Sequence, residues 1–229
     1  MTSRLAFCLF AFLLAGCASA PLDTAPAAAI DAWQPVLLPG KPATRYSRED
    51  KEGRKAIAAV SEQSASLWRR QAAIAPERVG AVHFSWWVQD LVPGGNVADI
   101  DREDAPARVI FGFAGDLSRL NLRTRMMYDL AEALTGEKPP YATLMYVWDA
   151  TAPVGSVIVN PRSDRIRKIV VDSGPGELRR WRDHRRDLAA DFRLAFDEAP
   201  GALTSIAVMT DSDNTRSQAT SWYGSVELD

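Results

Sequence analysis

Short segments in which apolar and polar residues alternate constrain the fold of this chain more than any other feature. They recur between clusters of Gly, Pro and Asp, and such period-two segments bounded by turn residues predict β-strands. Many short strands must bury two sheet faces against each other, so the sequence predicts a mainly β, jelly-roll-like antiparallel β-sandwich. The expected strands are residues 55–61, 81–89, 107–114, 142–148, 154–159, 166–171, 203–210 and 220–228.

Two other segments carry the longer period of an amphipathic helix. In residues 123–135 the apolar side chains share one face, and Gly136 follows as a C-terminal cap. Residues 177–198 carry a second apolar stripe, and arginines cover the remaining surface. We expect both helices to pack on the outside of the sandwich. The stripes consist of Met127, Leu130, Ala131 and Leu134 in the first segment, and of Leu178, Trp181, Leu188, Phe192, Ala195 and Phe196 in the second.

The amino terminus resembles a bacterial lipoprotein signal. Residues 5–15 are almost entirely apolar and follow Arg4, but they are too few for a transmembrane helix, which needs roughly 20 residues. They lead into the lipobox-like residues 14–17, Leu-Ala-Gly-Cys. The resemblance implies that residues 1–16 are removed and that Cys17 receives fatty acyl chains such as palmitate. The alternative is an ordinary secretory signal cut near Ala18 or Ala20.

The residues that follow the signal predict a tether and one domain. Residues 17–32 are rich in Ala and Pro and are expected to be flexible, which leaves residues 33–229 as a single β-sandwich domain. Since Cys8 leaves with the signal and Cys17 is acylated, the domain has neither a free thiol nor a disulfide. This excludes thiol catalysis and cysteine metal sites.

The net charge and the residues after Cys17 limit the expected partners and location of the protein. After loss of the signal the 27 basic residues fall by one, against 29 acidic residues, so the net charge is −3. This near balance indicates no general attraction to nucleic acid. Because no Asp follows Cys17, the signal resembles those sorted to the outer membrane. We therefore expect a lipid-anchored protein of the bacterial cell envelope, on the periplasmic face of that membrane.

One strand carries the best candidate for a ligand platform. In residues 81–89, alternation directs Trp86 toward the core and places His83, Ser85 and Trp87 on the opposite face. An indole ring with polar neighbours suits a sugar, whose apolar face stacks on the ring while its hydroxyl groups form hydrogen bonds. In the alternative interpretation a helix covers this face and Trp87 only packs.

A second candidate region contains an arginine and several carboxylates. Arg108 is expected to project from a face that Gly112 leaves uncrowded, close to the four carboxylates of residues 99–104. Repulsion among these groups is relieved if they pair with Arg102 and Arg108 or if a cation binds. A solvated acidic loop is the structural alternative.

Two aromatic side chains could extend a ligand groove. Tyr146 and Trp148 share one face of residues 142–148, although aromatic residues at strand spacing also serve as core.

Residues 210–215, Thr-Asp-Ser-Asp-Asn-Thr, resemble the start of a calcium loop. The carboxylates of Asp211 and Asp213 alternate, which lets hard oxygen ligands converge. The segment lacks the Gly and the distal Glu of an EF-hand. Asx turns that satisfy loop amides are the structural alternative, so calcium is a testable prediction.

Catalytic motifs are scarce. His83 and His184 are the only histidines, and they form no HExxH motif. No serine lies in a GxSxG turn. Paired carboxylates for glycoside hydrolysis stay open, because Asp104, Glu177 or Asp211 could meet in space.

Several motifs occur in order along the chain: residues 64–66, 84–88, 103–109, 144–148 and 210–215, with the helix around Trp181, Asp191, Phe192 and Phe196. Together they resemble the bacterial domain-of-unknown-function family 3047. The resemblance covers about residues 33–229 and implies no particular activity. Residues 213–228 are also similar to the last strands of carbohydrate-binding jelly rolls.

The sequence thus favours an envelope lipoprotein whose non-catalytic β-sandwich binds a glycan or another envelope component. The expected ligand-binding residues are Trp87, His83, Arg108, Tyr146 and Trp148. One alternative is a calcium-dependent polysaccharide hydrolase or lyase that uses Asp104, Arg108 and Tyr146. A further alternative is a protein-binding scaffold of an envelope complex.

Overall fold

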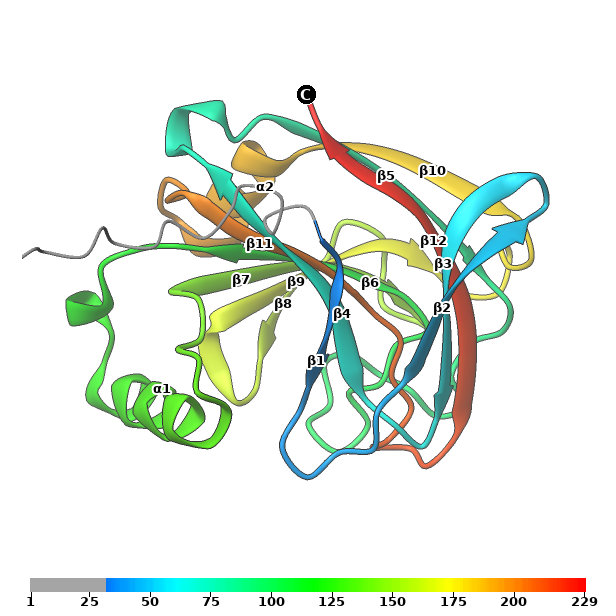
Figure 1. Ribbon diagram of the computed structural model, residues 1–229, viewed down its shortest axis with the longest axis horizontal. Helices are drawn as coiled ribbons and strands as arrows, with labels where there is room; N and C mark the ends of the chain where they lie inside the picture. The colour runs from blue at the N-terminus through cyan, green and yellow to red at the C-terminus, as the bar shows by residue number, and fades with distance from the viewer. Residues whose placement is uncertain (1–31) are drawn as a thin grey trace, which may run out of the picture.

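Two β-sheets pack face to face in the computed structural model, which describes residues 32–229 (Figure 1). The mainly β sandwich with two helices is therefore confirmed. The expected signal, residues 1–16, and residues 17–31 of the expected tether lie outside the described residues. No helix within residues 32–229 has the length and apolar character needed to cross a membrane.

The seven-stranded sheet has the order β1-β4-β11-β6-β7-β9-β8, and the five-stranded sheet has the order β10-β5-β12-β3-β2. The bounds of the first are β1 Gln34–Leu37, β4 Ser66–Ile74, β11 Leu203–Met209, β6 Arg108–Phe113, β7 Ala142–Asp149, β9 Ser163–Ser173 and β8 Val157–Asn160. Those of the second are β10 Trp181–Asp187, β5 Ala81–Val88, β12 Gln218–Leu228, β3 Arg54–Glu62 and β2 Arg45–Lys51. The helices are α1 Leu122–Thr135 and α2 Leu188–Phe196.

Aromatic residues of both sheets fill the space between them. Phe84 of β5 stacks on Tyr146 of β7 with 5.4 Å between ring centroids, and Phe111 of β6 meets Tyr146 edge-on at 5.4 Å. Trp86 and Trp148 are 0% exposed beside them. Since each buried aromatic side chain removes about 150–250 Å² from water, these residues dominate the core.

One strand pair departs from the antiparallel arrangement. β7 and β9 run parallel, with Thr143 opposite Ile166 and Val147 opposite Val170. The chain leaves β7, passes β9 to form the edge strand β8, and turns back antiparallel into β9. The two reversals make β9 parallel to β7.

The second expected helix is wrong over its first half. The chain forms β10 and then a shorter helix, α2, whose first turn is capped by the Asp187 side chain accepting a hydrogen bond from the Ala190 amide at 2.9 Å. β10 pairs along its whole length with β5. Trp181 therefore belongs to a strand, and Leu178 lies in the turn before it.

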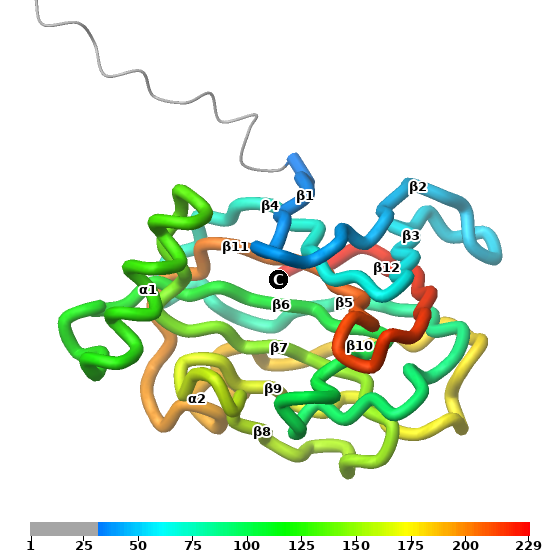
Figure 2. Tube along the Cα trace, turned by 90° about the horizontal axis from the view of Figure 1, so that it is seen from below, coloured from blue at the N-terminus to red at the C-terminus, as the bar shows by residue number. Residues whose placement is uncertain are grey.

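Helix α1 was expected to pack its apolar face on the sandwich, and this expectation is also wrong. The side chains of Leu130 and Leu134 are 60% and 64% exposed, whereas Tyr128 on the opposite side is buried. The Tyr128 hydroxyl donates to the Pro140 carbonyl at 2.9 Å. The helix lies at one end of the sandwich, apart from the packed sheet faces (Figures 1 and 2).

Besides β10, three strands were not predicted from the sequence. β1 is only four residues long, β2 is almost entirely polar, and β4 contains Arg69 and Arg70. Hydrogen bonding to neighbouring strands holds them in place, and Tyr46 of β2 and Trp68 of β4 also pack against the core.

Candidate functional site

Arg108 is buried and paired within the chain. It is 2% exposed, and its Nε and Nη2 donate to Asp211 Oδ1 and Oδ2, both at 2.9 Å. Nη2 also donates to the Glu103 carbonyl. Burial raises the pKa of Asp211 to about 6, even though Arg108 opposes the shift. The expectation that Arg108 projects from an uncrowded face is therefore wrong.

Gly112 shows how crowded that face is. A Cβ atom added to Gly112 would lie 2.5 Å from Ser205 Oγ and 2.8 Å from Pro140 Cγ. A glycine is needed here because Ser205 and Pro140 approach its backbone. These two residues leave no room for a ligand at Gly112.

The carboxylates of Asp104, Asp211 and Asp213 do converge, with oxygens within 4.8 Å of one another. Each already has donors from the chain. Asp104 accepts from the amides of Asn214 and Thr215 at 3.2 and 2.6 Å, and Asp213 pairs with Lys41. Because the chain supplies these donors, the arrangement favours a structural turn over a calcium site.

The same polar network extends to a buried lysine. Lys168 is 0% exposed, its Nζ lies 2.7 Å from Glu103 Oε1, and it donates to the Val97 carbonyl. Burial lowers the pKa of Lys168 to about 8, and the nearby Arg108 charge acts in the same direction. The network therefore holds the loop that contains Val97 and Glu103 against the seven-stranded sheet.

Tyr146 and Trp148 belong to the core. The Tyr146 hydroxyl donates to Asp191 Oδ2 at 2.7 Å, and the Trp148 Nε1 donates to the Gly174 carbonyl at 3.1 Å. Both side chains are 0% exposed. The structure therefore places neither in a ligand groove.

The residues of the alternative catalytic set do not share a site. Tyr146 lies opposite Val109 in the β6–β7 pair and faces the core, whereas Arg108 is the preceding residue of β6 and faces the other way. Asp104 lies with Arg108. A mechanism that needs Asp104, Arg108 and Tyr146 around one substrate has no geometric support.

Trp87 lies on the outer face of the five-stranded sheet, as alternation predicts. It is the middle residue of a tryptophan row that crosses three strands, with Trp181 opposite it on one side and Trp222 on the other. The sequence did not identify Trp181 and Trp222 as its neighbours, because Trp181 was assigned to a helix. His83, from the same face, is exposed and lies 2.9 Å from the Asp229 carboxylate.

The tip of the β2–β3 hairpin covers this tryptophan row. Lys51 Nζ lies 3.6 Å from the ring centroid of Trp87 and 3.9 Å from that of Trp222. Trp87 Nε1 donates to Glu52 Oε1 at 3.1 Å, and Trp181 Nε1 donates to the Lys51 carbonyl at 3.1 Å. Trp87 is only 6% exposed. It anchors the hairpin and is not an open platform.

The hairpin turn itself explains how Lys51 reaches the row. Glu52 and Gly53 have φ angles of 51° and 78°, the left-handed conformation of a tight two-residue turn. Such a turn matches the twist of the flanking strands and fixes the tip over the sheet.

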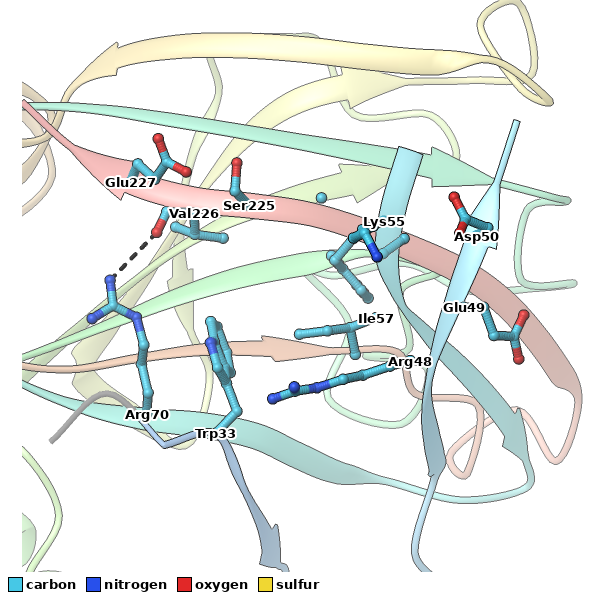
Figure 3. Close-up of a pocket in the computed structure, with 13 residues that line it drawn as sticks. Trp33, Arg48, Glu49, Asp50, Lys55, Ile57, Arg70, Ser225, Val226 and Glu227 are labelled. Atoms are coloured by element: carbon cyan, nitrogen blue, oxygen red, sulfur yellow. Dashed lines mark hydrogen bonds between the residues drawn. The ribbon is translucent and has the colours of Figure 1, made fainter. Parts of the chain in front are cut away.

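An open cleft lies on the other side of the same hairpin, between the edges of the two sheets (Figure 3). Its volume is about 690 Å³, within the range of roughly 300–1,000 Å³ that is usual for small-molecule sites. Residues from both sheets line it: Trp33, Arg48, Glu49, Asp50, Lys55, Ala56, Ile57, Arg70, Tyr223, Gly224, Ser225, Val226 and Glu227.

Trp33 and Arg70 form the wall contributed by the seven-stranded sheet. The Arg70 guanidinium lies 5.9 Å from the centroid of the Trp33 ring, and it donates to the Val226 carbonyl of β12 at 3.4 Å. Figure 3 shows the Trp33 ring between Arg70 and Ile57. The indole is partly exposed, so it can offer a face to a ligand.

Sequence reasoning missed the cleft. Trp33 stood at the expected domain boundary, Arg48 and Lys55 lie in a strongly charged segment, and Arg70 lies in a strand that was not expected. Trp33 was the available signal in the sequence, but residues this far apart in sequence meet only through the sheet pairing.

The fold and the cleft define a β-sandwich protein with a partly exposed indole in an open cleft. The chain belongs to the family described as "Protein of unknown function (DUF3047)", whose model matches residues 31–227. The resemblance found in the sequence is thereby confirmed.

Solved structures with a similar arrangement include a family 11 carbohydrate-binding module of the cellulosomal cellulase Lic26A-Cel5E of Clostridium thermocellum. It shares 8% identity at a TM-score of 0.42, with 86% of each chain covered. The xyloglucanase domain of NopAA, a type three effector from Sinorhizobium fredii solved in complex with cellobiose, shares 7% identity at a TM-score of 0.46. The match covers 86% of this chain and 93% of that one. No curated protein matches the chain.

Proposed function

We propose that this protein is a lipid-anchored envelope protein that binds a saccharide in the cleft without catalysis. The observation that supports this proposal is the cleft, where the partly exposed Trp33 ring is surrounded by hydrogen-bonding side chains. A sugar needs this combination, because its apolar face stacks on an aromatic ring and its hydroxyl groups need polar partners at the edge.

The binding proposal is tested with purified full-length protein on a glycan array, followed by titration calorimetry on the best ligand. Trp33→Ala should weaken binding at least 10-fold, and Trp33→Phe should keep part of the affinity. Arg78→Gln is a matched control, since Arg78 lies outside the cleft. Saccharide binding that Trp33→Ala leaves unchanged would refute the cleft as the site.

The lipid anchor rests on the amino-terminal sequence. Residues 14–17 have the order of a lipobox, and Cys17 would be the acylated residue. Intact-mass analysis of membrane-extracted protein should show cleavage before Cys17 and the added mass of acyl chains. Cys17→Ser should release the protein from the outer-membrane fraction. A mature chain that begins after Ala18 or Ala20 would support the secretory alternative.

The absence of a shared geometry for Asp104, Arg108 and Tyr146 supports a non-catalytic role for this set. Asp104→Asn would have to abolish turnover of an envelope polysaccharide for the enzyme alternative to hold. Incubation of the protein with such polysaccharides, followed by reducing-end and unsaturated-product assays, provides the measurement.

The outward face of α1 favours a second candidate function, a protein-binding surface. Leu122, Met126, Leu130 and Leu134 follow one another at four-residue spacing, and all are at least 60% exposed. Soluble proteins rarely expose a continuous apolar ridge without a partner.

A second copy of this chain is the occupant that the charges of α1 fit best. The first half of the helix is basic, with Arg123 and Arg125, and the second half is acidic, with Asp129 and Glu132. Two antiparallel copies would place opposite charges side by side. Sedimentation velocity should show a weak dimer that Met126→Ser with Leu130→Ser abolishes. A monomer at all concentrations would refute self-association.

A further inference from the structure

Two cations in the cleft have no partner in the part of the chain that the structure describes. The side chains of Arg48 in β2 and Lys55 in β3 form no hydrogen bond or ion pair with any residue from 32 to 229. Many other basic side chains of the fold do, such as Arg54 with Asp183 at 2.6 Å. The cleft therefore presents cationic donors that the fold itself does not use.

One acidic residue of the cleft lining, Glu49, has its carboxylate bound by other side chains of the chain. Alternation along β2 places Arg48 on the face of the strand opposite to that of Glu49. The Glu49 carboxylate accepts from Ser47 Oγ at 2.7 Å and from Trp222 Nε1 at 3.2 Å, on the outer face of the sheet. These hydrogen bonds hold the pKa of Glu49 below its ordinary value, so Glu49 stays ionised but engaged elsewhere.

The remaining acidic groups of the cleft, Asp50 and Glu227, form no ion pair with Arg48 or Lys55. Asp50 and Glu227 line the cleft beside Arg48, Lys55 and Arg70. Asp50 stands opposite Lys55 in the β2–β3 pair, yet no ion pair forms between them. In Figure 3 the Arg48 side chain extends below Ile57 toward Trp33, while Lys55 projects above Ile57.

We infer that the cleft recognises an acidic saccharide, with the sugar ring on Trp33 and its carboxylate between Arg48 and Lys55. This inference rests on the proposed function and names its ligand class. A guanidinium forms charge-assisted hydrogen bonds to a carboxylate with two parallel donors, and a lysine ammonium adds a mobile point charge. Neutral sugars would leave both cations without partners.

The test compares each acidic oligosaccharide with its own methyl ester, which keeps the ring and removes the charge. The probes are oligogalacturonate, oligomannuronate and hyaluronan fragments, titrated calorimetrically into the full-length protein. At least one acidic probe should bind 10-fold or more tightly than its ester. Its affinity should fall as salt rises from low to high concentration, because exposed charges are screened.

The variants separate charge recognition from stacking. Arg48→Gln and Lys55→Gln should each lower affinity for the acidic probe about 5-fold to 20-fold and leave the ester unchanged. Trp33→Ala should weaken both probes. Arg78→Gln is the charge control and should change neither.

Each outcome decides between the two proposals. Equal binding of acid and ester, lost only in Trp33→Ala, would overturn the acidic ligand and keep saccharide binding. No binding of any probe, charged or neutral, would overturn both. Binding of acid that Arg48→Gln and Lys55→Gln leave intact would place the charged group elsewhere.

Discussion

Two sets of basic side chains occupy opposite surroundings in this fold. Arg108 is 2% exposed and gives two hydrogen bonds to Asp211, whereas Arg48 and Lys55 are exposed in the cleft and have no ion pair among residues 32–229. A buried charge must be paired from within the chain, because an unpaired one costs several kcal/mol. A charge at the surface can instead serve a ligand. The supply of partners within the chain, and not the residue type, separates the structural Arg108 from Arg48 and Lys55, to which we assign a ligand.

The largest effect is expected when the interior pair is broken. Arg108→Ala would leave the Asp211 carboxylate and the Glu103 carbonyl without their main donor in a buried site. Breaking a buried ion pair from one side costs roughly 3–5 kcal/mol. Urea denaturation should show this loss in the free energy of unfolding. A loss below about 1 kcal/mol would mean that solvent reaches the pair.

The tryptophan row should be the next most sensitive region. Trp87→Ala would open a cavity under Lys51 and remove a hydrogen bond to Glu52, at a cost of roughly 3 kcal/mol. Because the β2–β3 hairpin also carries Arg48 and Lys55, ligand affinity should fall as well, although Trp87 does not line the cleft. Trp87→Phe is the matched control and should restore most of the stability. Unchanged stability in Trp87→Ala would show that the hairpin is held by other contacts.

The interior pair should also give a pH dependence. Burial raises the pKa of Asp211 to about 6, above roughly 3.9 in an unfolded chain. The folded protein then retains a proton that the unfolded chain releases, so this contribution is present below about pH 4 and is lost as the pH rises through 6. Between these values, wild-type stability should fall relative to Asp211→Asn by up to about 1.4 kcal/mol per pH unit. Parallel profiles for the two proteins in urea unfolding would contradict the raised pKa.

Substitutions of the cleft cations should change stability very little, in contrast to Arg108→Ala. Arg48→Gln and Lys55→Gln remove exposed groups without partners in the described chain, and should change the free energy of unfolding by less than about 0.5 kcal/mol. Thermal melts recorded beside the binding titrations would verify this. A clear destabilisation would mean that these cations support the fold.

Calcium should have the smallest effect of all. The carboxylates of Asp104, Asp211 and Asp213 have donors from the chain, so millimolar calcium or a chelator should shift the melting temperature by less than about 1 °C. A rise of several degrees with calcium, lost in Asp213→Asn, would restore the metal site.

The sequence predicted the strands in which apolar residues dominate and missed those that are short or rich in charged residues. β5, β6, β7 and β11 alternate apolar residues and lie close to the expected ranges. β2 and β10 are edge strands of the five-stranded sheet, and their residues are largely charged, so neither periodicity nor composition identifies them. Their positions depend on hydrogen bonding to a neighbouring strand, which is a property of the assembled sheet.

The candidate site was less predictable, for a related reason. Alternation correctly placed Trp87 on the outer face of its strand, but it could not show that Lys51 would cover the ring. The cleft combines Trp33, Arg48, Lys55 and Arg70, whose proximity arises from two sheets that meet only after folding. Alternation along a strand indicates which face of the sheet a side chain occupies. It does not indicate which residues from other segments cover that side chain.

The positions of the last two strands, β11 and β12, affect the order in which this chain can fold. β11 lies between β4 and β6, and β12 lies between β5 and β3, so each sheet is closed in its middle by a segment near the carboxyl end. Four earlier strands, β3, β4, β5 and β6, lack one of their two hydrogen-bonding neighbours until residues 203–228 are in place. Folding is therefore expected to be a late, concerted event that begins after the chain is nearly complete. Until residues 203–228 are available neither sheet can be completed, so the native pairing of the two sheets depends on segments that are far from residues 54–113 in sequence.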